Sequence, residues 1–441
     1  MWVQLLRRVT WLAAAGLLGA CAFSPTSGQD PAPRVPYLDD ASFRRAELEA
    51  SLVNPSNAYS QLRLARYASG DGADWERLPE WNPPVEPIVA SELDAPGGAS
   101  TTALSRRAVP LALPATVASE DDPALVALGE LAFHRYPTQV GAYFGVGLTS
   151  RSAAARYGLW VDETRGVGGL VRARMADGSG AVSLTCSTCH SAQGAEGDLV
   201  AGLPNARLDV GAATLAAQGV PEGAATGDPI AAWGPGRVDV TTTAGTEPVR
   251  IPDLRPVRWL THLQQDATVR SRDLTALAIR IETLIITSGD QVVRPPRVVA
   301  LALAAYVRAL AATLPSPDGA ARASPRGAAA FASQCAGCHI APALTGPPVP
   351  LATIGTDPTF GLSASRGTGA YRVPSLHGVG SRGPLLHDGT IASVDALFDA
   401  GRLAPSFAGR LHGSGAVLGH LFGLTLGAED RSALLAYLRA L

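Results

Sequence analysis

The sequence predicts a mainly α-helical protein built from two tandem units, with long loops and a few short strands. Three observations carry this prediction: a five-residue cysteine–histidine pattern that occurs twice, helical spacing of apolar residues around each copy, and Gly-, Pro- and Thr-rich stretches between helices. The chain has 441 residues and a net charge of −2. This length allows two or three domains, and the charge balance argues against a nucleic-acid partner.

The repeated pattern is C-x-x-C-H, the attachment pattern of a c-type haem. Two thiols at this spacing add across the porphyrin vinyl groups, and the adjacent histidine becomes the proximal iron ligand. Four of the five cysteines fall in the two copies. A zinc site could use both cysteine pairs but would not need the histidines. We therefore predict two covalently bound haem c groups, held by Cys186, Cys189 and His190 and by Cys335, Cys338 and His339.

The N-terminus predicts export. Arg7 and Arg8 precede an apolar run, Val9–Ala20, that is too short to span a bilayer. The run ends at Leu18-Gly19-Ala20-Cys21, which resembles a bacterial lipobox, so we expect lipidation at Cys21. The alternative is an ordinary signal peptide with an incidental cysteine. We expect a periplasmic lipoprotein of the outer membrane, held to the membrane by its lipid alone.

The composition divides the chain into five parts. The stretch after Cys21 is rich in Ser, Pro, Gly and Asp, as a tether is, whereas the next part is too apolar for a disordered linker. That part is expected to pack along the surface of the main body. The predicted parts are a signal peptide (1–21), a tether (22–40), an N-terminal extension (41–120), a first unit (121–318, haem at 186–190) and a second unit (319–441, haem at 335–339).

Helical spacing and end signals place the main helices. Asp122 and Asp273 are expected to be N-caps, and Gly289 is expected to end the helix that Asp273 begins. Residues 195–255 are expected to form loops and small strands. The predicted helices are 43–52, 123–132, 274–288, 296–314, a short one carrying Phe331, and one from Glu429 or Asp430 to Leu441.

A short internal repeat supports duplication. Ala305–Leu310 and Ala436–Leu441 share the pattern Ala-Tyr-x-Arg-Ala-Leu, and each follows its own C-x-x-C-H by about a hundred residues. This predicts two cytochrome c-like units, each closed by a Tyr-containing helix. Shared helical composition in an Ala- and Leu-rich chain is the alternative.

Two segments downstream resemble a known family. Tyr371–His377 and Gly383–Gly389 are similar to the second-domain signature of bacterial diheme cytochrome c peroxidases and their methylamine dehydrogenase-maturing relatives. The likeness covers residues 121–441 in architecture and is sharp around the haem motifs and 371–389. This chain departs from the family's signature at two places: the family's Leu-Arg-Asn is Leu376-His377-Gly378 here, and its Pro-Tyr-x-His is Pro384-Leu385-Leu386-His387. Gly419–Leu426 resembles a diheme branch that includes rubber-cleaving oxygenases.

The sixth ligand of the second haem is expected to be a histidine. Family peroxidases use a methionine here, but this chain has only Met1 and Met175, and it has no lysine. A histidine at the position of His420 is implied by the rubber-oxygenase-like branch, so His420 is preferred and His412 is next. His377 is a further candidate, and His387 is expected to pack in the turn or haem pocket.

The first haem is predicted to have an open or water-bound position. No histidine follows His190 until His262, and the other candidates are Met175 and His134. An open iron allows peroxide or oxygen to bind, whereas a sixth ligand favours electron transfer. Ligation by His262 would therefore indicate an electron carrier.

The resemblance implies further site residues. A distal acid–base carboxylate is needed for peroxide cleavage, and Glu282 is the nearest equivalent, although a helical Glu–Arg salt bridge is the alternative. Gln264 and Gln265 do not match the family's glutamine. Trp259 and Trp233 are candidates for the tryptophan between the haems. Arg372 and Arg382 are expected to reach haem propionates. A structural Ca²⁺ between the domains is also implied.

These features predict an oxidoreductase. Electrons would enter at the second haem from a small cytochrome or cupredoxin and reduce hydrogen peroxide at the first. A variant would use peroxide or oxygen to oxidise a substrate. The alternatives are an electron carrier with two six-coordinate irons and a haemless zinc module.

Overall fold

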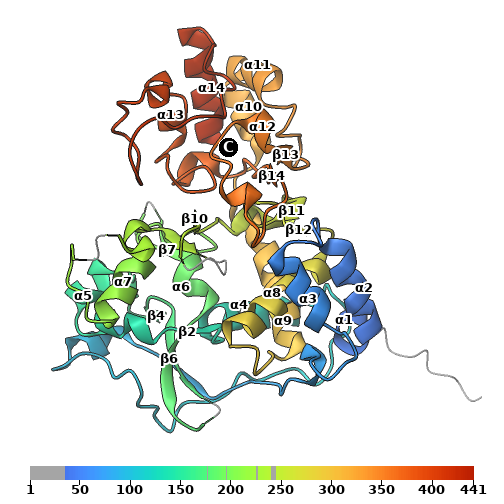
Figure 1. The fold of residues 1–441 in the computed structure, drawn as a ribbon, viewed down its shortest axis with the longest axis vertical. Helices are drawn as coiled ribbons and strands as arrows, with labels where there is room; N and C mark the ends of the chain where they lie inside the picture. Colours follow the sequence, from blue (N-terminus) through green and yellow to red (C-terminus); the bar gives the residue numbers. More distant parts are fainter. Residues whose placement is uncertain (1–34, 176, 195, 225–226, 240–244) are drawn as a thin grey trace, which may run out of the picture.

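The computed structural model describes residues 35–175, 177–194, 196–224, 227–239 and 245–441 (Figure 1). Helices predominate and the strands are short, which confirms the expected mainly α class. The predicted signal peptide, Cys21 and most of the tether lie outside the described residues. The longer helices are α2 (Ala41–Ser51), α3 (Ala58–Arg66), α4 (Pro123–Arg135), α7 (Val210–Ala217), α8 (Leu274–Ser288), α9 (Arg297–Ala309), α11 (Pro325–Gln334) and α14 (Ala428–Ala440).

Shorter elements connect these helices. The short α-helices are α1 (Pro36–Asp39), α5 (Arg151–Arg156), α6 (Cys186–His190), α10 (Pro317–Ala323), α12 (Leu351–Ile354) and α13 (Val394–Leu397). One antiparallel sheet has the order β1-β5-β6-β2, from β1 (Val85–Pro87), β5 (Leu170–Arg174), β6 (Gly180–Leu184) and β2 (Gln139–Val140). The two-stranded pairs are β3 (Val161–Asp162) with β4 (Gly166–Val167), β7 (Ser191–Gln193) with β8 (Leu199–Ala201), β9 (Arg237–Asp239) with β10 (Pro248–Arg250), β11 (His262–Leu263) with β12 (Val269–Arg270), and β13 (Val349–Pro350) with β14 (Ala370–Tyr371).

The N-terminal extension shares a hydrophobic core with the helices that follow it. Tyr37, Leu48, Tyr67 and Trp75 are buried in one cluster with residues of α4, α8 and α9. A second cluster joins the β5–β6 hairpin to α7 and to the 3₁₀ helix η3 (Ala142–Leu148). The extension is therefore part of the core and not only a surface segment.

Helices α4 and α9 cross where a glycine allows close approach. A Cβ atom on Gly129 would lie 2.0 Å from the carbonyl oxygen of Ala302. One turn further along, the rings of Phe133 and Tyr306 meet with centroids 5.3 Å apart. Glycine is required because any side chain would force the helices apart.

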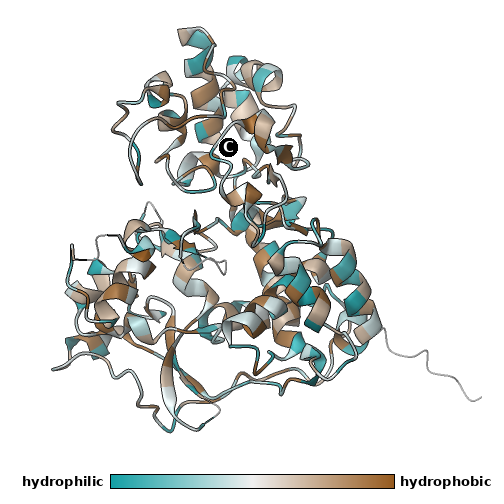
Figure 2. Ribbon diagram, in the orientation of Figure 1, coloured by the Kyte–Doolittle hydropathy of each residue, from teal (hydrophilic) through white to brown (hydrophobic). Residues whose placement is uncertain are grey.

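Helices α11 and α14 cross in the same way. A Cβ atom on Gly327 would lie 2.1 Å from the carbonyl oxygen of Ala433, and the ring centroids of Phe331 and Tyr437 are 5.2 Å apart. Both crossings thus place a Gly-x-x-x-Phe helix on an Ala-x-x-x-Tyr helix. Figure 2 shows hydrophobic and hydrophilic residues alternating along α14.

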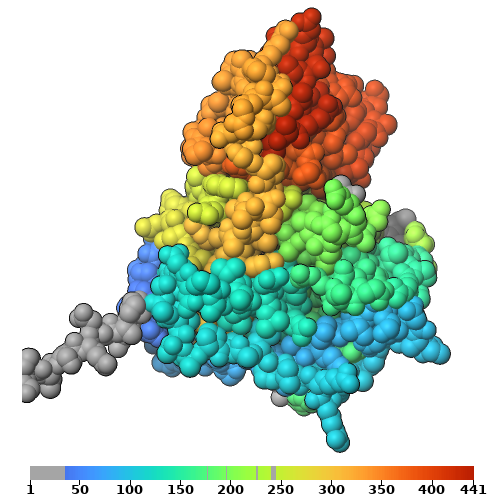
Figure 3. Space-filling model, turned by 180° about the vertical axis from the view of Figure 1, so that it is seen from behind, coloured from blue at the N-terminus to red at the C-terminus, as the bar shows by residue number. Residues whose placement is uncertain are grey.

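The C-terminal part has its own core. Buried residues of α11, α13 and α14 and the loops between them form a third cluster. This part stands on the rest of the molecule, which lies below it in Figures 1 and 3. Among the described residues, the helical stretch Arg297–Ala323 is long and apolar enough to cross a membrane, but 61% of its most apolar window is buried inside the protein, as expected of a core helix.

Candidate haem-binding sites

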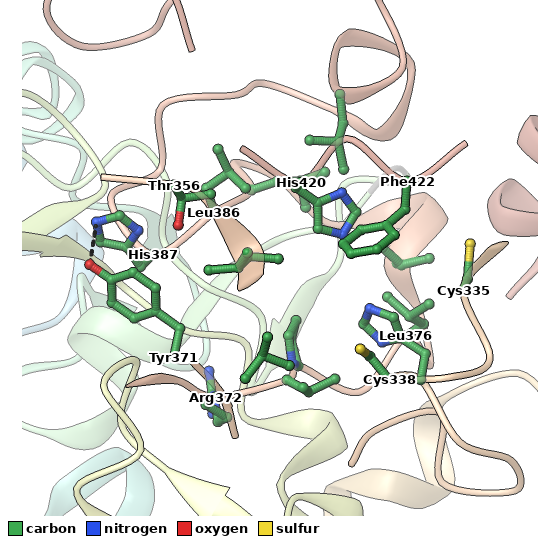
Figure 4. A pocket seen from close by; sticks show the side chains of 18 of the residues that line it. Cys335, Cys338, Thr356, Tyr371, Arg372, Leu376, Leu386, His387, His420 and Phe422 are labelled. Carbon is green, nitrogen blue, oxygen red and sulfur yellow. Dashed lines mark hydrogen bonds between the residues drawn. The ribbon is translucent and has the colours of Figure 1, made fainter. Parts of the chain in front are cut away.

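The second C-x-x-C-H opens onto a cavity of about 230 Å³. Helix α11 ends at Gln334, and the chain then turns so that the His339 amide donates to the carbonyl oxygen of Cys335 at 2.9 Å. Cys335, Cys338 and His339 all line the cavity. In Figure 4 the two thiols lie at one end of it, and Tyr371 and His387 lie at the other.

A backbone hydrogen bond orients the imidazole of His339. Its Nδ1 lies 3.2 Å from the carbonyl oxygen of Leu344, a bond that leaves Nε2 available to a metal. Burial, followed by the charge of His420, lowers the pKa of His339 to about 4. The ring is therefore neutral at pH 7, which is the form that binds a metal.

His420 also lines this cavity. Its ring lies edge-on to Phe422, with centroids 5.6 Å apart (Figure 4). Its backbone has φ = +45°, a left-handed conformation that is uncommon for histidine. Burial is the main cause that lowers its pKa, so this ring is neutral too. The expected ligand is thus placed in the same cavity as His339, although its ligation stays a prediction.

The other histidines have different surroundings. His412 lies against Gly234, where a Cβ atom would come 2.9 Å from its Nδ1, and it does not line the cavity. His387 lines the far end and stacks on Tyr371 with centroids 4.3 Å apart. His377 stacks on Trp259 at 3.9 Å, and its Nε2 donates to a backbone carbonyl. The geometry therefore favours His420 over His412.

Three arginines, of which Arg250 and Arg382 are buried and Arg372 is partly buried, place positive charge beside the cavity. Arg250, Arg372 and Arg382 line it, and the nearest carboxylate, Asp253, lies 4.0 Å from Arg382. Burial and then the neighbouring guanidinium groups lower the pKa of Arg250 to about 9 and that of Arg372 to about 10. The Nε atoms of Arg372 and Arg382 are buried without hydrogen-bond partners.

This donor set fits a haem. Among the described residues, Asp253 is the carboxylate within ion-pair distance of these arginines, and it also pairs with Arg255 at 2.7 Å. Two propionates would supply the missing acceptors, and guanidinium groups bind carboxylates well. The remaining lining is largely apolar, as a porphyrin requires, and includes Val349, Val373, Leu376, Leu385, Leu386 and Phe398.

The first C-x-x-C-H forms the short helix α6, which a glycine turn holds in place. The side chains of Thr185 and Thr188 donate to the carbonyl oxygen of Gly169 at 2.8 and 3.1 Å. His190 Nδ1 lies 3.0 Å from the carbonyl oxygen of Pro252, and burial lowers the pKa of this ring to about 4. Its imidazole is thus oriented and neutral, as that of His339 is.

The first motif lies between two hydrophobic clusters. Cys186 packs against the cluster of α4, α8 and α9, whereas Cys189 packs against that of the β5–β6 hairpin. Burial raises the pKa of both thiols to about 12. Both stay protonated, so they are unreactive as free nucleophiles at neutral pH.

The candidate sixth ligands of the first haem make other contacts. Met175 lies in the turn at the end of the β5–β6 hairpin remote from α6. Arg165 Nη1 lies 2.6 Å from His134 Nε2, and His262 Nδ1 lies 3.1 Å from Thr261 Oγ1. None of these contacts involves His190, and the open first haem stays a prediction.

Glu282 lies in a buried hydrogen-bond network. Its side chain is 1% exposed, and its Oε2 accepts from the hydroxyls of Tyr37 (2.9 Å) and Tyr67 (2.7 Å). Arg297 Nε lies 3.4 Å from Oε1. Both carboxylate oxygens thus have partners: Tyr37 from the end of the predicted tether, Tyr67 from the N-terminal extension and Arg297 from α9. The acid–base role of Glu282 stays a prediction beside this anchoring role.

The remaining cofactor hypotheses receive little support. The two cysteine pairs pack in different clusters and all four thiols are free, so they do not form one four-thiolate zinc site. Within the described residues no three His, Cys, Asp or Glu side chains converge as a metal site. Calcium held by backbone carbonyls stays a prediction. Trp233 is buried in the second cluster and Trp259 stacks on His377.

No family model and no curated protein matches this chain. Among solved structures, one that aligns with it is a MauG-like protein associated with microbial copper homeostasis. The identity is 18% and the TM-score is 0.34, over 48% of this chain and 78% of that chain. A TM-score of this size is too low to assign a function, which therefore depends on the residues themselves.

Proposed function

We propose that this chain is an exported diheme c-type cytochrome that acts as an oxidoreductase, reducing hydrogen peroxide or a related small oxidant at the first haem. The observation that carries the proposal is the cavity at the second motif. It brings two thiols, three histidines (His339, His387 and His420) and three arginines to one largely apolar space. No other common cofactor needs this combination.

The repeated helix crossing supports two tandem cytochrome c-like units. In each, a helix carrying Gly-x-x-x-Phe lies before the haem motif and crosses a later Ala-x-x-x-Tyr helix. A duplicated haem motif and a duplicated crossing are more simply explained by duplication of one unit than by two coincidences. Each unit would then hold one haem.

The residues of the second site have distinct tasks. A bound haem supplies one-electron chemistry. Leu344 fixes the ring of His339 through its carbonyl oxygen, and Arg372 and Arg382 offer guanidinium groups to the propionates. The apolar lining keeps water out. Trp259 and His377 stack on each other between the first unit and the C-terminal part.

The partners and location follow from this role. The electron donor would be a small cytochrome or cupredoxin, and the final acceptor would be hydrogen peroxide at an open first iron. Lipidation at Cys21 would hold the protein on the periplasmic side of the outer membrane. Calcium between the units would be structural.

The test uses the full chain matured in a host that attaches haem c. We expect two haems by mass and by staining after denaturation, one low-spin and one high-spin ferric signal, and peroxide-dependent oxidation of a reduced small cytochrome. Cys186→Ala with Cys189→Ala should remove the high-spin signal and turnover. Cys335→Ala with Cys338→Ala should remove the low-spin signal. A matured protein without haem would refute the proposal.

A non-catalytic electron carrier is the second candidate, and the environment of Glu282 favours it. A distal acid–base group must reach a bound peroxide, but both oxygens of this carboxylate already have partners. Two low-spin ferric signals and no peroxide turnover, even after partial reduction, would identify the carrier. A high-spin signal with turnover would identify the enzyme.

A further inference from the structure

Arg402 is a buried cation that donates only to backbone carbonyls among the described residues. Its side chain is fully buried, and it reaches the carbonyl oxygens of Leu397 (2.8 Å), Val417 (2.5 Å), Gly419 (2.9 Å) and His420 (2.9 Å). Burying a guanidinium group without an ion pair is costly. The hydrogen bonds to four carbonyl oxygens offset that cost, and most of them connect the arginine to one segment of the chain.

Three of the four acceptors belong to residues 417–420, the segment that ends in His420. The amide of Val417 returns a hydrogen bond to the Arg402 carbonyl at 2.7 Å, and the amide of His420 donates to Ile354 at 2.7 Å. A Cβ atom on Gly419 would lie 2.3 Å from the backbone of Gly355. The segment is therefore fixed between Arg402 on one side and residues 354–356 on the other.

The conformation of this segment is unfavourable for a histidine. Gly419 has φ = +77° and His420 has φ = +45°. The left-handed region is unfavourable for a residue with a Cβ atom. The hydrogen bonds from Arg402 and to Ile354 oppose relaxation to an ordinary conformation.

Within the described part of the chain, no hydrogen bond from its Nδ1 atom orients the imidazole ring of His420. His339 and His190 each have Nδ1 against a backbone carbonyl, at 3.2 and 3.0 Å. The Nδ1 of His420 is buried and makes no hydrogen bond to another residue. Outer hydrogen bonds usually fix the ring of a ligating histidine. For His420, the hydrogen bonds made by the backbone of residues 417–420 must position the ring instead.

We propose that Arg402 is a positioning residue that holds His420 at the cavity that His339 also lines, and so determines how firmly His420 can ligate the second haem. This inference depends on the proposed function, because it assumes a haem in that cavity. A lysine cannot replace the arginine fully, since it has three donors on one nitrogen and no planar fork.

The test compares Arg402→Gln and Arg402→Lys with Arg410→Gln in the matured full chain. Arg410 is a matched control because it also donates to two loop carbonyls nearby, those of His412 and Ala416, both at 2.9 Å. Wild type and Arg410→Gln should keep the full low-spin ferric signal. Arg402→Gln should lose part of it and should bind imidazole at the second iron about 10-fold more tightly. Arg402→Lys should show a smaller change, and it serves as the measured variant if the glutamine protein does not mature.

Two further readouts separate the possible failures. Amide exchange at Val417 and His420 should be at least about 10-fold faster in Arg402→Gln. If the low-spin signal and imidazole affinity match wild type, Arg402 is not a positioning residue. His420→Ala should lose the low-spin signal completely; if it does not, His420 is not the ligand and the inference fails while the diheme assignment stands. Absence of haem from the wild type would remove the proposed function itself.

Discussion

Glu282 connects the N-terminal extension to α8 through hydrogen bonds from two tyrosines. Replacing it with glutamine keeps the shape but removes the charge that Arg297 faces at 3.4 Å. Arg297 keeps its closer partner Glu76 at 2.5 Å, so the cost is smaller than the about 3–5 kcal/mol of leaving a buried charge unpaired. Glu282→Gln should lower the free energy of unfolding by about 1–3 kcal/mol in urea titrations. If Glu282 is only an anchor, both haem spectra and turnover per folded molecule should be unchanged.

The tyrosines provide the matched control for that result. Tyr37→Phe and Tyr67→Phe each remove one hydrogen bond that a neutral hydroxyl donates to the carboxylate. Each should cost about 1–3 kcal/mol and leave turnover intact. A Glu282→Gln protein that is as stable as wild type but has lost its peroxide turnover would instead establish the acid–base role.

His134 should make stability depend on pH. Burial and then the charge of Arg165 lower its pKa to about 4, against about 6.5 in the unfolded chain. Between these values the unfolded chain binds a proton that the folded protein does not. The free energy of unfolding should therefore fall as pH falls from 6.5 to 4, by at most about 1.4 kcal/mol per pH unit from this group.

Urea titrations of wild type and His134→Gln over this range check the expectation. The glutamine can still accept from Arg165, so the difference between the two proteins should grow only below pH 6.5. Arg165→Gln should reduce the slope of the wild type, because it removes a cation that opposes protonation. Equal slopes in all three proteins would contradict the assignment.

At the residue scale, the sequence predicted the ligating types better than the groups that hold them. The cysteines and histidines of the two motifs are predicted as haem-binding residues by spacing alone, and their haem binding stays a prediction, whereas Arg372 and Arg382 do line the second cavity. Arg402 gave no local signal, because its partners are backbone carbonyls brought together by the fold. The hydrogen bonds that anchor Glu282 could not be predicted either, because one of its partners, Tyr37, is 245 residues away in the sequence.

At the element scale, the turn at Gly169 supports the first haem motif. Gly169 has φ = +62°, and a Cβ atom there would lie 2.7 Å from the amide nitrogen of Thr188. Gly169→Ala should therefore displace α6, reduce attachment of the first haem and leave the second haem loaded. Haem content by mass spectrometry and the size of the high-spin signal measure this effect.

Gly178 is the matched control for this substitution. It also has a left-handed backbone, φ = +83°, but a Cβ atom there meets nothing within 4 Å. Gly178→Ala should lower the free energy of unfolding by about 1–2 kcal/mol, because alanine is unfavourable in the left-handed conformation. Gly169→Ala should be less stable than Gly178→Ala by about 1–3 kcal/mol because of the steric overlap. Equal haem content and stability in the two variants would show that the contact with α6 is unimportant.

Helices with clear periodicity were predicted well, and elements defined by distant partners were not. Asp122 and Asp273 cap α4 and α8 by accepting from Ala124 and Ala276, and Gly289 ends α8. Helix α7 was missed inside 195–255, because its apolar residues show almost no helical sidedness. The β5–β6 hairpin was missed because Gly-rich flanks obscured its alternation. The Gly-x-x-x-Phe pattern at both crossings was present in the sequence and would have strengthened the repeat.

At the scale of the whole molecule, the N-terminal extension joins the first unit to the C-terminal part. The amides of Ala58 and Tyr59 donate to the carbonyl oxygens of Ala364 and Ser365 at 3.1 and 2.9 Å. Helix α8 of the first unit contacts the same extension, because Glu282 accepts from Tyr67 and Thr283 accepts from Arg63. The extension is therefore expected to keep the two C-x-x-C-H motifs in one fixed arrangement, which the proposed electron transfer between the units would require.

Asn57 offers a selective test of this connection. Its Nδ2 donates to the carbonyl oxygens of Arg366 (2.9 Å) and Gly367 (3.3 Å), while its Oδ1 caps α3 by accepting from the Ser60 amide. Asn57→Ser keeps a capping oxygen but loses both contacts with the C-terminal part. The free energy of unfolding should fall by about 1–3 kcal/mol, and the amides of Ala58 and Tyr59 should exchange faster under native conditions.

Asn82→Ser is the matched control. The Asn82 amide donates to the carbonyl oxygen of Leu111 and accepts from its backbone amide, so both contacts lie within the N-terminal half of the chain. Asn82→Ser should lose a similar amount of stability without changing amide exchange at Ala58 and Tyr59. In Asn57→Ser, electron transfer between the haems should slow after rapid reduction of the second haem, since looser units spend less time at the optimal separation. Transfer rates that are equal in Asn57→Ser, Asn82→Ser and wild type would show that the core of each unit, and not the extension, fixes their arrangement.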